Sequence, residues 1–260
     1  MIFHERLVTC RPKRYVVCRM SLVPPSNPSV PNALILGASG VLGRALAVAF
    51  RNAGYRALGT GFRQVPDGDE VFQFDATQTL EIARLAAWVE RVAPKLDVIV
   101  HAIGGTHDQL VMRMSDQEWH KTLEQNLGSA FRVARAMWGH LAAGGGGQMI
   151  FVGSWAGRTG RGGQGAYAAA KAGVIALCQS MAREGAGAGI RVNCVVPGYF
   201  PSPMTTGLTP EALARLGADA VKPGFSNVEE MVSFMVHLAG MRGVTGQVFQ
   251  LDGRIAPALS

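Results

Sequence analysis

Short, mostly apolar runs alternate with longer amphipathic stretches over most of this chain. The runs are five to seven residues long, which is typical of strands that are buried in a sheet. Strands are predicted at residues 32–37, 55–60, 71–75, 96–101, 148–153, 190–196 and 246–251. Helices are predicted up to residue 53, over 80–92 and 115–141, around 167–171, and from about residue 228. The alternation predicts an α/β fold with about seven parallel strands in one doubly wound sheet and helices on both faces.

Length and composition favour one domain, which we place at residues 32–260. A chain of 260 residues with 48% hydrophobic content can bury a large core. Residues 1–31 lack a clear period and end in the proline-rich S-L-V-P-P-S-N-P-S-V-P, so we interpret them as a flexible or mis-started N-terminal extension. Their arginines and few acidic residues leave an organelle presequence as an alternative, and Met20 would begin a sensible shorter chain. No apolar run reaches the ~18 residues of a membrane span, so no membrane partner is expected.

Charge and cysteine content narrow the classes of partner. The net charge is +7, of which +4 falls before residue 20, so the body of the protein is only mildly basic. No nucleic-acid partner is expected, and binding of nucleic acid through the basic tail is a third class of function that removal of residues 1–30 would test. The cysteines form no C-x-x-C pair and no metal-ligand spacing, which predicts a reduced, cytoplasmic protein without a metal site. They are Cys10 and Cys18, near the N-terminus, and Cys178 and Cys194, in apolar runs and expected in the core.

Three glycines separate the first predicted strand from the following helix: Gly37, Gly40 and Gly43, in G-A-S-G-V-L-G. Such a turn lets the backbone approach a pyrophosphate at a helix N-terminus, which predicts a Rossmann-type dinucleotide site. No Asp or Glu ends the second strand to bind a ribose diol; Arg63 follows instead and suits a 2′-phosphate. The expected cofactor is therefore NADP(H) rather than NAD(H). Asp75, at the end of the third strand, is placed to meet an adenine amino group.

Candidate catalytic residues follow the fifth predicted strand. Tyr167 and Lys171 are four residues apart in an Ala-rich run and should share one face of a helix. A nearby ammonium favours the phenolate, so Lys171 is expected to lower the Tyr167 pKa from ~10 and make this residue a general acid or base. Ser154 ends the apolar run, where open α/β sheets place their chemistry. Asn126 interrupts an apolar helix face, where it is either satisfied locally or holds a water near Lys171.

Taken together, these motifs resemble those of the short-chain dehydrogenase/reductase family, in its small single-domain type, from about residue 32 to the C-terminus. The family's order and spacing are matched by the glycine turn 37–43, Asp75, Asn126, Ser154, Tyr167, Lys171 and Pro197-Gly198. Within the family, residues 108–119, D-Q-L-V-M-R-M-S-D-Q-E-W, and Asn126-Leu-Gly are most similar to 3-oxoacyl-[acyl-carrier-protein] reductases.

The resemblance implies a role for each candidate catalytic residue. Tyr167 would protonate the carbonyl oxygen of a ketone, and Ser154 would hold and polarise that oxygen. Lys171 would lower the Tyr167 pKa and bind the nicotinamide ribose, and Asn126 would support a water that resupplies protons. With the residues above, the implied cofactor site comprises Gly37, Ser39, Gly40, Leu42, Gly43, Arg63, Asp75, Ala102, Tyr167, Lys171, Pro197, Gly198 and Ser202.

Two stretches depart from the family pattern. Val41 takes the place of the middle glycine, a spacing similar to that of larger, epimerase-like members, although the chain is too short for their added substrate domain. After the fourth strand, His101-Ala-Ile-Gly104 replaces N-N-A-G and is similar to enoyl reductases. Those enzymes generally space Tyr and Lys farther apart and lack this Ser, so carbonyl reduction is favoured. His101 is interpreted as a strand-end residue bonded to the backbone rather than as a catalytic group.

The sequence gives fewer indications of the substrate and its carrier than of the cofactor. An acidic acyl carrier protein would need a basic docking patch, for which Arg113, Arg132 and Arg135 are candidates. Residues 142–148 and Ala188 lack the basic side chains that 3-oxoacyl-[acyl-carrier-protein] reductases often have at these positions. The loop at 199–224, with a short helix, is expected to decide the substrate. Candidates for an apolar pocket are Trp155, Tyr199, Phe200 and Met204.

The sequence thus predicts an NADP(H)-dependent oxidoreductase that reduces a ketone to a secondary alcohol, with a tyrosine as general acid. The expected substrate is a 3-oxoacyl thioester of fatty acid biosynthesis, carried by acyl carrier protein or coenzyme A. The alternatives are a dehydrogenase for another small ketone or alcohol and a non-catalytic NADP(H)-binding scaffold, which would not need Ser154, Tyr167 and Lys171 together. The resemblance also implies a homotetramer or homodimer.

Overall fold

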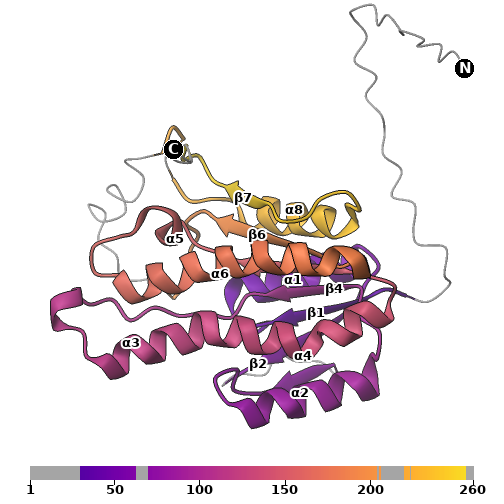
Figure 1. Ribbon diagram of the computed structural model, residues 1–260. Coiled ribbons are helices and arrows are strands. Elements are labelled where there is room, and N and C mark those ends of the chain that lie inside the picture. Colours follow the sequence, from indigo (N-terminus) through magenta and orange to yellow (C-terminus); the bar gives the residue numbers. More distant parts are fainter. Residues whose placement is uncertain (1–29, 63–69, 204, 206–219, 223, 256–260) are drawn as a thin grey trace, which may run out of the picture.

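A single sheet of parallel strands forms the centre of the computed structural model, which describes residues 30–62, 70–203, 205, 220–222 and 224–255 (Figure 1). The strand order is β3-β2-β1-β4-β5-β6-β7. The strands are β1 (Asn32–Leu36), β2 (Arg56–Gly61), β3 (Val71–Gln73), β4 (Val98–His101), β5 (Gln148–Val152), β6 (Arg191–Pro197) and β7 (Val248–Leu251). The predicted fold class, a Rossmann-type doubly wound α/β domain, is confirmed.

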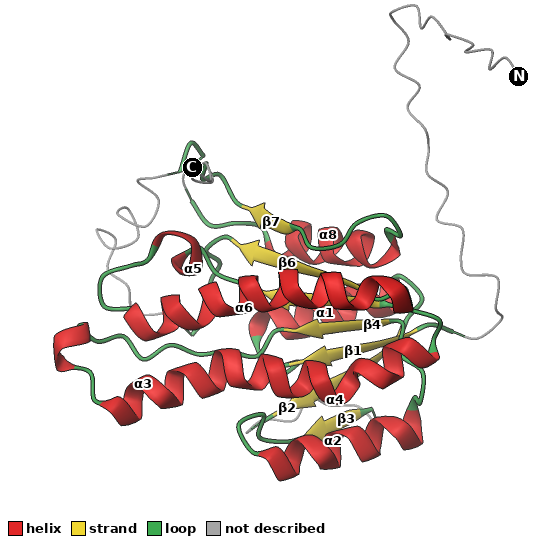
Figure 2. Ribbon diagram, in the orientation of Figure 1, coloured by secondary structure: helices red, strands yellow, loops and turns green. Residues whose placement is uncertain are grey.

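Helices cover both faces of the sheet, and each face has its own core (Figure 2). One core includes Leu34, Leu85 and Met137, and the other includes Ile35, Phe50 and Met235. Neighbouring residues of β1 thus point to opposite faces, as the alternation of a strand requires. The longer helices of the first face are α2 (Thr79–Val92), α4 (Ser129–Ala143) and α6 (Gly165–Gly185), and those of the second are α1 (Val41–Asn52) and α8 (Val228–Gly240).

The remaining helical segments are short, and two helix starts have side-chain caps. The Ser115 hydroxyl accepts the N–H of Glu118, whose carboxylate accepts the N–H of Ser115, and this capping box begins α3 (Asp116–Leu123). Asn227 caps α8 in a similar way, accepting from Glu229 and Glu230. The other short segments are η1 (Val111–Arg113), η2 (Glu124–Gly128), α5 (Ala156–Thr159) and η3 (Ala186–Ala188).

The structure differs from the sequence expectation in two places. The third strand ends at Gln73, so Asp75 follows the strand instead of ending it. The helix expected over residues 115–141 is divided into α3, a π-helical turn at η2 and α4. Most of the loop at 199–224 lies outside the described residues, as do residues 1–29 of the N-terminal extension, Arg63 and Met204.

Strand order reverses between β1 and β4, and this reversal positions the ligand site. In open α/β sheets, ligands bind outside the carboxyl ends of the strands at such a point. Gly37 follows β1 and Ala102 follows β4, and the N–H of Ala102 donates to Leu36 O at 3.0 Å. A Cβ on Gly37 would lie 3.0 Å from the carbonyl oxygen of Ala102. The two loops therefore meet in backbone contact at the reversal.

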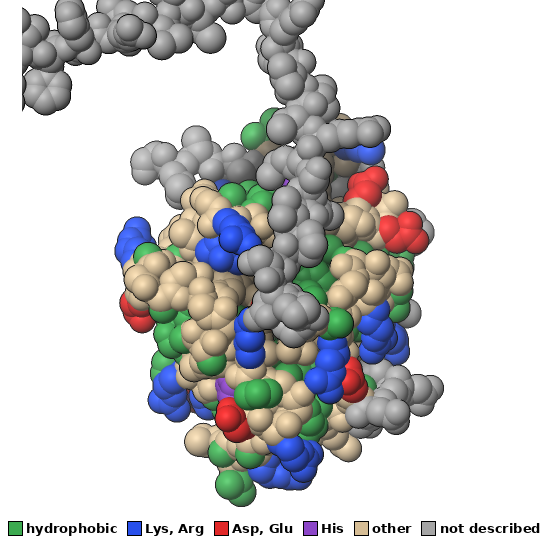
Figure 3. All heavy atoms as spheres, turned by 90° about the vertical axis from the view of Figure 1, so that its right-hand side faces the viewer, with side chains coloured by type: hydrophobic (Ala, Val, Ile, Leu, Met, Phe, Trp, Pro, Cys, Tyr) green, Lys and Arg blue, Asp and Glu red, His purple; other side chains and the backbone are tan. Residues whose placement is uncertain are grey.

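Surface and core agree with the composition. Cys178 and Cys194 are fully buried, as the apolar runs around them predicted, whereas Cys10 and Cys18 lie outside the described residues. On the face in Figure 3, Lys and Arg side chains are spread among acidic and apolar groups rather than gathered in one patch. No helix in the described part of the chain is long and apolar enough to cross a membrane.

Close packing of α1 on the glycine turn generates the first prediction. A Cβ on Gly43 would lie 2.1 Å from Gly37 O and 2.8 Å from the Ala38 Cα, and these are backbone atoms that cannot rotate away. Gly43→Ala should therefore lower the free energy of unfolding by about 2 kcal/mol or more, as measured by urea denaturation. The matched control is Gly139→Ala in α4, where a new Cβ meets nothing within 4 Å. The control should gain up to about 1 kcal/mol from helix propensity, and equal losses in both variants would contradict the packing argument.

Candidate active site

A cavity of about 930 Å³ lies at the carboxyl ends of the strands, where the strand order reverses. Its volume is in the range of small-molecule and cofactor sites. Among the predicted cofactor residues, Gly37, Ser39, Gly40, Asp75 and Ala102 line it. Leu42 and Gly43 are buried behind it in the first turn of α1. Five of the predicted cofactor residues thus line the cavity, and the others that line it were not singled out from the sequence.

The glycine turn fits a dinucleotide pyrophosphate. Gly37 has φ +85°, a conformation that favours glycine, and its lack of a side chain allows the contact with Ala102. Helix α1 begins at Gly40 without a side-chain cap and without an acidic residue in its first turn. Its first backbone N–H groups therefore have no partner from a side-chain cap, and the helix dipole favours an anion there.

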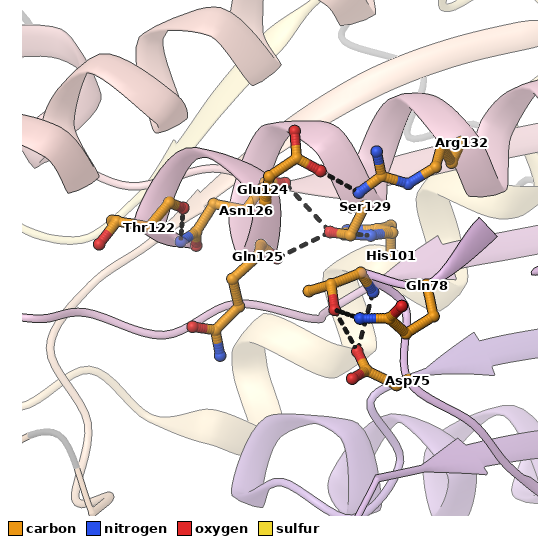
Figure 4. A network of polar contacts seen from close by, with 10 residues as sticks. Asp75, Gln78, His101, Thr122, Glu124, Gln125, Asn126, Ser129 and Arg132 are labelled. Atoms are coloured by element: carbon orange, nitrogen blue, oxygen red, sulfur yellow. Dashed lines mark hydrogen bonds and ion pairs between the residues drawn. The ribbon is translucent and has the colours of Figure 1, made fainter. Parts of the chain in front are cut away.

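The rim of the cavity at β2 and β3 suits the ribose and adenine end of a dinucleotide. Thr60, Gly61 and Phe62 line the cavity at the end of β2, and none of them carries a carboxylate. Asp75 Oδ1 accepts hydrogen bonds from the N–H of Thr77 at 2.9 Å and from its hydroxyl at 2.7 Å. These bonds hold the Asp75 carboxylate at the cavity edge (Figure 4).

Ser154 and Tyr167 are brought together from different segments. Ser154 follows β5, whereas Tyr167 lies in the first turns of α6 and is half-buried. Their side chains are hydrogen-bonded to each other. The Ser154 hydroxyl also accepts the N–H of Ala156 at 3.3 Å, which fixes it at the start of α5.

The pKa of Tyr167 is raised, not lowered as the sequence predicted. Burial is the largest cause and raises the Tyr167 pKa. The hydrogen bond with Ser154 lowers this pKa, whereas the negative charges of an ionised Tyr199 and of the Asp108 carboxylate raise it. Lys171, whose Nζ lies 5.7 Å from the centroid of the Tyr167 ring, does not offset this burial, because its own pKa is below that of the phenol and it loses its charge first. The Tyr167 phenol is therefore protonated at neutral pH.

Lys171 is 3% exposed and its amine contacts the sheet. Nζ donates to the carbonyl oxygen of Val152, the last residue of β5, at 2.9 Å. Burial lowers the Lys171 pKa to about 8, with Cys194 acting in the opposite direction. A Cβ on Gly104 would lie 3.1 Å from Lys171 Nζ and 2.7 Å from Asn126 Oδ1. Both side chains therefore pack against this glycine.

Asn126 lies in the π-helical turn and is fully buried. Its Nδ2 donates to Gly105 O at 2.8 Å and to Thr122 O at 2.9 Å, and its Oδ1 accepts from Gly105 N at 3.3 Å. The side chain is thus satisfied locally, which was one of the two expectations from the sequence. These bonds tie the π turn to the loop after β4.

A serine completes the π turn and meets His101. The N–H of Ser129 donates to Glu124 O, which leaves Gln125 O without its usual helical donor. The Ser129 hydroxyl donates to that carbonyl oxygen instead, at 2.7 Å, and the Nε2 of His101 lies 3.4 Å from the same hydroxyl (Figure 4). Burial, together with the positive charge of Lys171, lowers the His101 pKa to about 3. His101 is therefore neutral at physiological pH and supports the turn.

The remaining predicted residues cluster after β6. Pro197 ends β6, and a Cβ on Gly198 would collide with Ser226 and Asp252, so this glycine allows the chain to pass between them. The N–H of Ser202 donates to the Thr205 hydroxyl at 2.8 Å. None of the three lines the cavity described above. Within the described residues, no three His, Cys, Asp or Glu side chains gather so as to hold a metal ion.

Comparisons with known proteins agree with this geometry. A protein-family model described as "Enoyl-(Acyl carrier protein) reductase" matches residues 37–253. The 3-oxoacyl-[acyl-carrier-protein] reductase FabG of Escherichia coli is 32% identical over 232 residues, covering 85% of this chain and 95% of FabG. Nodulation protein G of Rhizobium sp. is 32% identical over 235 residues, covering 86% and 96%. The chain belongs to the short-chain dehydrogenase/reductase family.

Solved structures of short-chain dehydrogenases/reductases have the same fold. The Pseudomonas aeruginosa RhlG/NADP active-site complex superposes with a TM-score of 0.78 at 26% identity, covering 86% of this chain and 95% of RhlG. A putative gluconate dehydrogenase from Agrobacterium tumefaciens gives 0.80 at 28% identity, covering 86% and 94%. As a short-chain dehydrogenase/reductase, the protein is an oxidoreductase that acts on a CH–OH group.

Several residues of this short-chain dehydrogenase/reductase site were not found from the sequence. Thr60 lines the cavity and its Oγ1 accepts the N–H of Gly37 at 3.2 Å. Ser129 was missed although it follows Asn126 by one helical turn, which is a usable signal once a break in the helix is expected. Other cavity residues that the sequence did not single out include Lys121, Glu124 and Gln125.

The buried imidazole gives a prediction for the pH dependence of stability. The His101 pKa is about 3 in the folded protein against about 6.5 in an unfolded chain, so the unfolded chain binds more protons between these values. Stability from this residue is therefore present above about pH 6.5 and is lost as the pH falls towards 3. In urea titrations at pH 7 and pH 4, His101→Asn should lose less stability than the wild type, by about 3 kcal/mol.

The control for that titration is His237→Asn, which removes an exposed ring from α8. Asn at position 101 keeps a polar group beside Ser129, so the variant is expected to fold. If the wild type and His101→Asn lose the same stability between pH 7 and pH 4, the buried neutral imidazole is ruled out.

Proposed function

We propose that this protein is an NADP(H)-dependent ketoreductase that converts a 3-oxoacyl thioester to the 3-hydroxyacyl thioester. The observation that carries the proposal is the protonated Tyr167 phenol, hydrogen-bonded to Ser154 and close to the buried amine of Lys171. Reduction of a ketone needs a proton for the oxygen and a hydride for the carbon. The reduced nicotinamide, when bound, would supply the hydride.

Each catalytic residue has a separate task in this proposal. The Ser154 hydroxyl donates to the carbonyl oxygen and orients it against Tyr167. The Tyr167 phenol then transfers its proton to that oxygen as the C–H bond forms, which leaves a phenolate and the alcohol. The nearby Lys171 cation stabilises the phenolate because an opposite charge favours the ionised form. Asn126, next to Lys171, would support the water that returns a proton.

Preference for NADP(H) is supported by the rim of the cavity at β2. No carboxylate ends that strand among Thr60, Gly61 and Phe62, so nothing there repels a 2′-phosphate. Arg63, which lies outside the described residues, follows directly in the sequence. The RhlG structure is that of a complex with NADP, and it shares 26% identity with this chain.

The thioester substrate is supported by the FabG relatives, which are named as 3-oxoacyl-[acyl-carrier-protein] reductases. The family model is described as an enoyl reductase, but the spacing of Tyr167 and Lys171 together with Ser154 favours reduction of the C=O bond. Of the arginines considered for carrier docking, Arg132 is paired with Glu124, whereas Arg113 and Arg135 are exposed. We further propose a cytoplasmic homotetramer or homodimer that acts in fatty acid biosynthesis.

Another small ketone or alcohol is the second candidate substrate. The stretch Ala142–Gln148 contains no basic residue that would attract an acidic carrier protein, and the A. tumefaciens neighbour is described as a putative gluconate dehydrogenase. The test is to follow NADPH oxidation with an acetoacetyl group offered on coenzyme A and on acyl carrier protein, beside a panel of free ketones. Turnover of free ketones alone would establish the second candidate.

Removal of the phenol should stop the reaction without loss of the cofactor. Tyr167→Phe is expected to lower kcat by about 10²–10⁴-fold, because it removes the general acid, while NADPH binding measured by fluorescence stays within twofold. The control is Tyr55→Phe, which removes a phenol from a ring packed on Phe50, away from the cavity. A wild type that binds NADPH but reduces no substrate, with Tyr167→Phe indistinguishable from it, would favour the non-catalytic scaffold.

Cofactor preference gives a separate prediction. Arg63→Ala should raise the KM for NADPH by about 10- to 100-fold, the range of a lost charge-assisted hydrogen bond, and leave the KM for NADH within about twofold. The matched control is Arg51→Ala, which removes an exposed cation from the last turn of α1. Equal weakening of both cofactors would contradict recognition of a 2′-phosphate by Arg63.

A further inference from the structure

Arg254 is a buried cation that none of the proposed roles uses. It follows β7 and is 8% exposed. Its guanidinium carbon lies 4.4 Å from the centroid of the Trp155 ring and 4.9 Å from that of the Tyr199 ring. Both distances are within the range of cation–π contacts, and Arg stacks on aromatic faces better than Lys does.

The charge of Arg254 is neutralised within the same segment. Its Nε donates to Asp252 Oδ2 at 2.6 Å, and its Nη2 contacts the same oxygen. Gln250 Nε2 donates to Asp252 Oδ1 at 2.7 Å and to Arg254 O at 2.8 Å. Burial raises the Asp252 pKa, but the hydrogen bonds from Arg254 and Gln250 outweigh it and the net pKa is lowered. A buried ion pair with these extra hydrogen bonds avoids the cost of an uncompensated charge.

The two rings held by Arg254 belong to loops that carry the proposed chemistry. Trp155 comes directly after Ser154, and Tyr199 comes directly after Gly198. The negative charge of an ionised Tyr199 raises the Tyr167 pKa, which indicates that the two phenols are near each other. Figure 1 shows β6 and β7 ending on the side of the molecule where α5 lies. Arg254 thus joins the ends of three segments around Ser154 and Tyr167.

The clamp, which we define as Trp155, Tyr199, Asp252 and Arg254, has two further attachments. Arg161 Nη1 donates to the Tyr199 hydroxyl at 3.1 Å, which holds the polar end of the ring at the exposed edge. The N–H of Val221 donates to Gly253 O at 2.8 Å, and Ala220 pairs with Arg254 in an antiparallel bridge. The chain that returns from the proposed substrate loop is therefore fixed to the clamp.

We propose that Arg254 is a positioning residue that determines substrate specificity by holding Trp155 and Tyr199 as a rigid aromatic wall beside Ser154 and Tyr167. Because Asp252 neutralises the guanidinium, Arg254 adds no net charge to the ring faces that it holds. The wall would favour a ketone with an apolar acyl chain over a polyhydroxylated or carboxylate substrate. This inference rests on the proposed ketoreductase function and adds its substrate class.

The test compares Arg254→Met, which keeps the length of the side chain but removes the cation, with Arg254→Lys, which keeps the charge. Steady-state rates are measured at saturating NADPH with 3-oxoacyl coenzyme A thioesters of short and long acyl chain. Arg254→Met should raise KM for the long chain about tenfold and for the short chain less than about threefold, with kcat within about threefold. Arg254→Lys should fall between Arg254→Met and the wild type.

Two further variants keep the outcome clear. Arg254→Met leaves Asp252 buried without its partner, so the double variant Asp252→Asn with Arg254→Met removes both charges and tests the wall if the single variant unfolds. Arg183→Met is the matched control, because Arg183 is exposed on α6 and bonds only the Gln179 carbonyl of its own helix among the hydrogen bonds seen in the described residues. Its KM values should equal those of the wild type for both chain lengths.

A second measurement does not depend on turnover. Acrylamide quenching of tryptophan fluorescence should increase in Arg254→Met as the Trp155 ring is released, and the increase should disappear when Trp155→Phe is also present. If the wild type reduces no 3-oxoacyl thioester, the proposed function fails, and the quenching result alone decides whether Arg254 holds the ring. Equal changes in KM for both chain lengths, or quenching unchanged by Arg254→Met, would overturn the proposal.

Discussion

The buried amine of Lys171 is the group around which the site is built. Its Nζ donates to Val152 O at the end of β5, so a cation of α6 is fixed to the sheet at the point where the strand gives way to Ser154. Space for the side chain comes from neighbours that have none. A Cβ on Gly157 would lie 2.9 Å from the Lys171 Cβ, and one on Gly104 would lie 3.1 Å from Nζ. Helix α5 and the loop after β4 therefore both pack closely against α6 at this position.

Burial also decides the protonation of the groups around the amine. The same dry surroundings that lower the Lys171 pKa to about 8 raise the Tyr167 pKa and lower that of His101 to about 3. Each shift favours the uncharged form, as desolvation requires. In the proposed mechanism, the phenol keeps its proton until a carbonyl oxygen accepts it, and the neutral imidazole only supports the π turn. Burial is the largest cause of all three shifts.

The sequence predicted the parts of the site that depend on spacing and failed where burial decides. The glycine turn and the four-residue interval from Tyr167 to Lys171 are local patterns, and the structure places both at the cavity or beside Ser154. The direction of the Tyr167 pKa was predicted wrongly, because a sequence shows the ammonium nearby but not the desolvation that outweighs it. Asn126 was expected to interrupt only the apolar face of a continuous helix, whereas the structure has a π turn there that Ser129 completes. Arg254 gave no signal because its partners Trp155 and Tyr199 are far away in the chain.

Two of the buried polar residues that the sequence motifs did not explain, His101 and Arg254, share one physical feature. His101 stands where the family pattern has Asn, and its ring is placed against the Ser129 hydroxyl, while Arg254 is placed against Asp252. An unpaired buried polar group costs about 1–3 kcal/mol, and an unpaired buried charge costs more, so neither side chain is tolerable without its partner. The pair of His101 and Ser129 supports the π turn that holds Asn126. In the other pair, Arg254 contacts the Trp155 ring, next to Ser154. The need to satisfy these groups therefore helps to fix both the π turn that holds Asn126 and the rings of the proposed substrate wall.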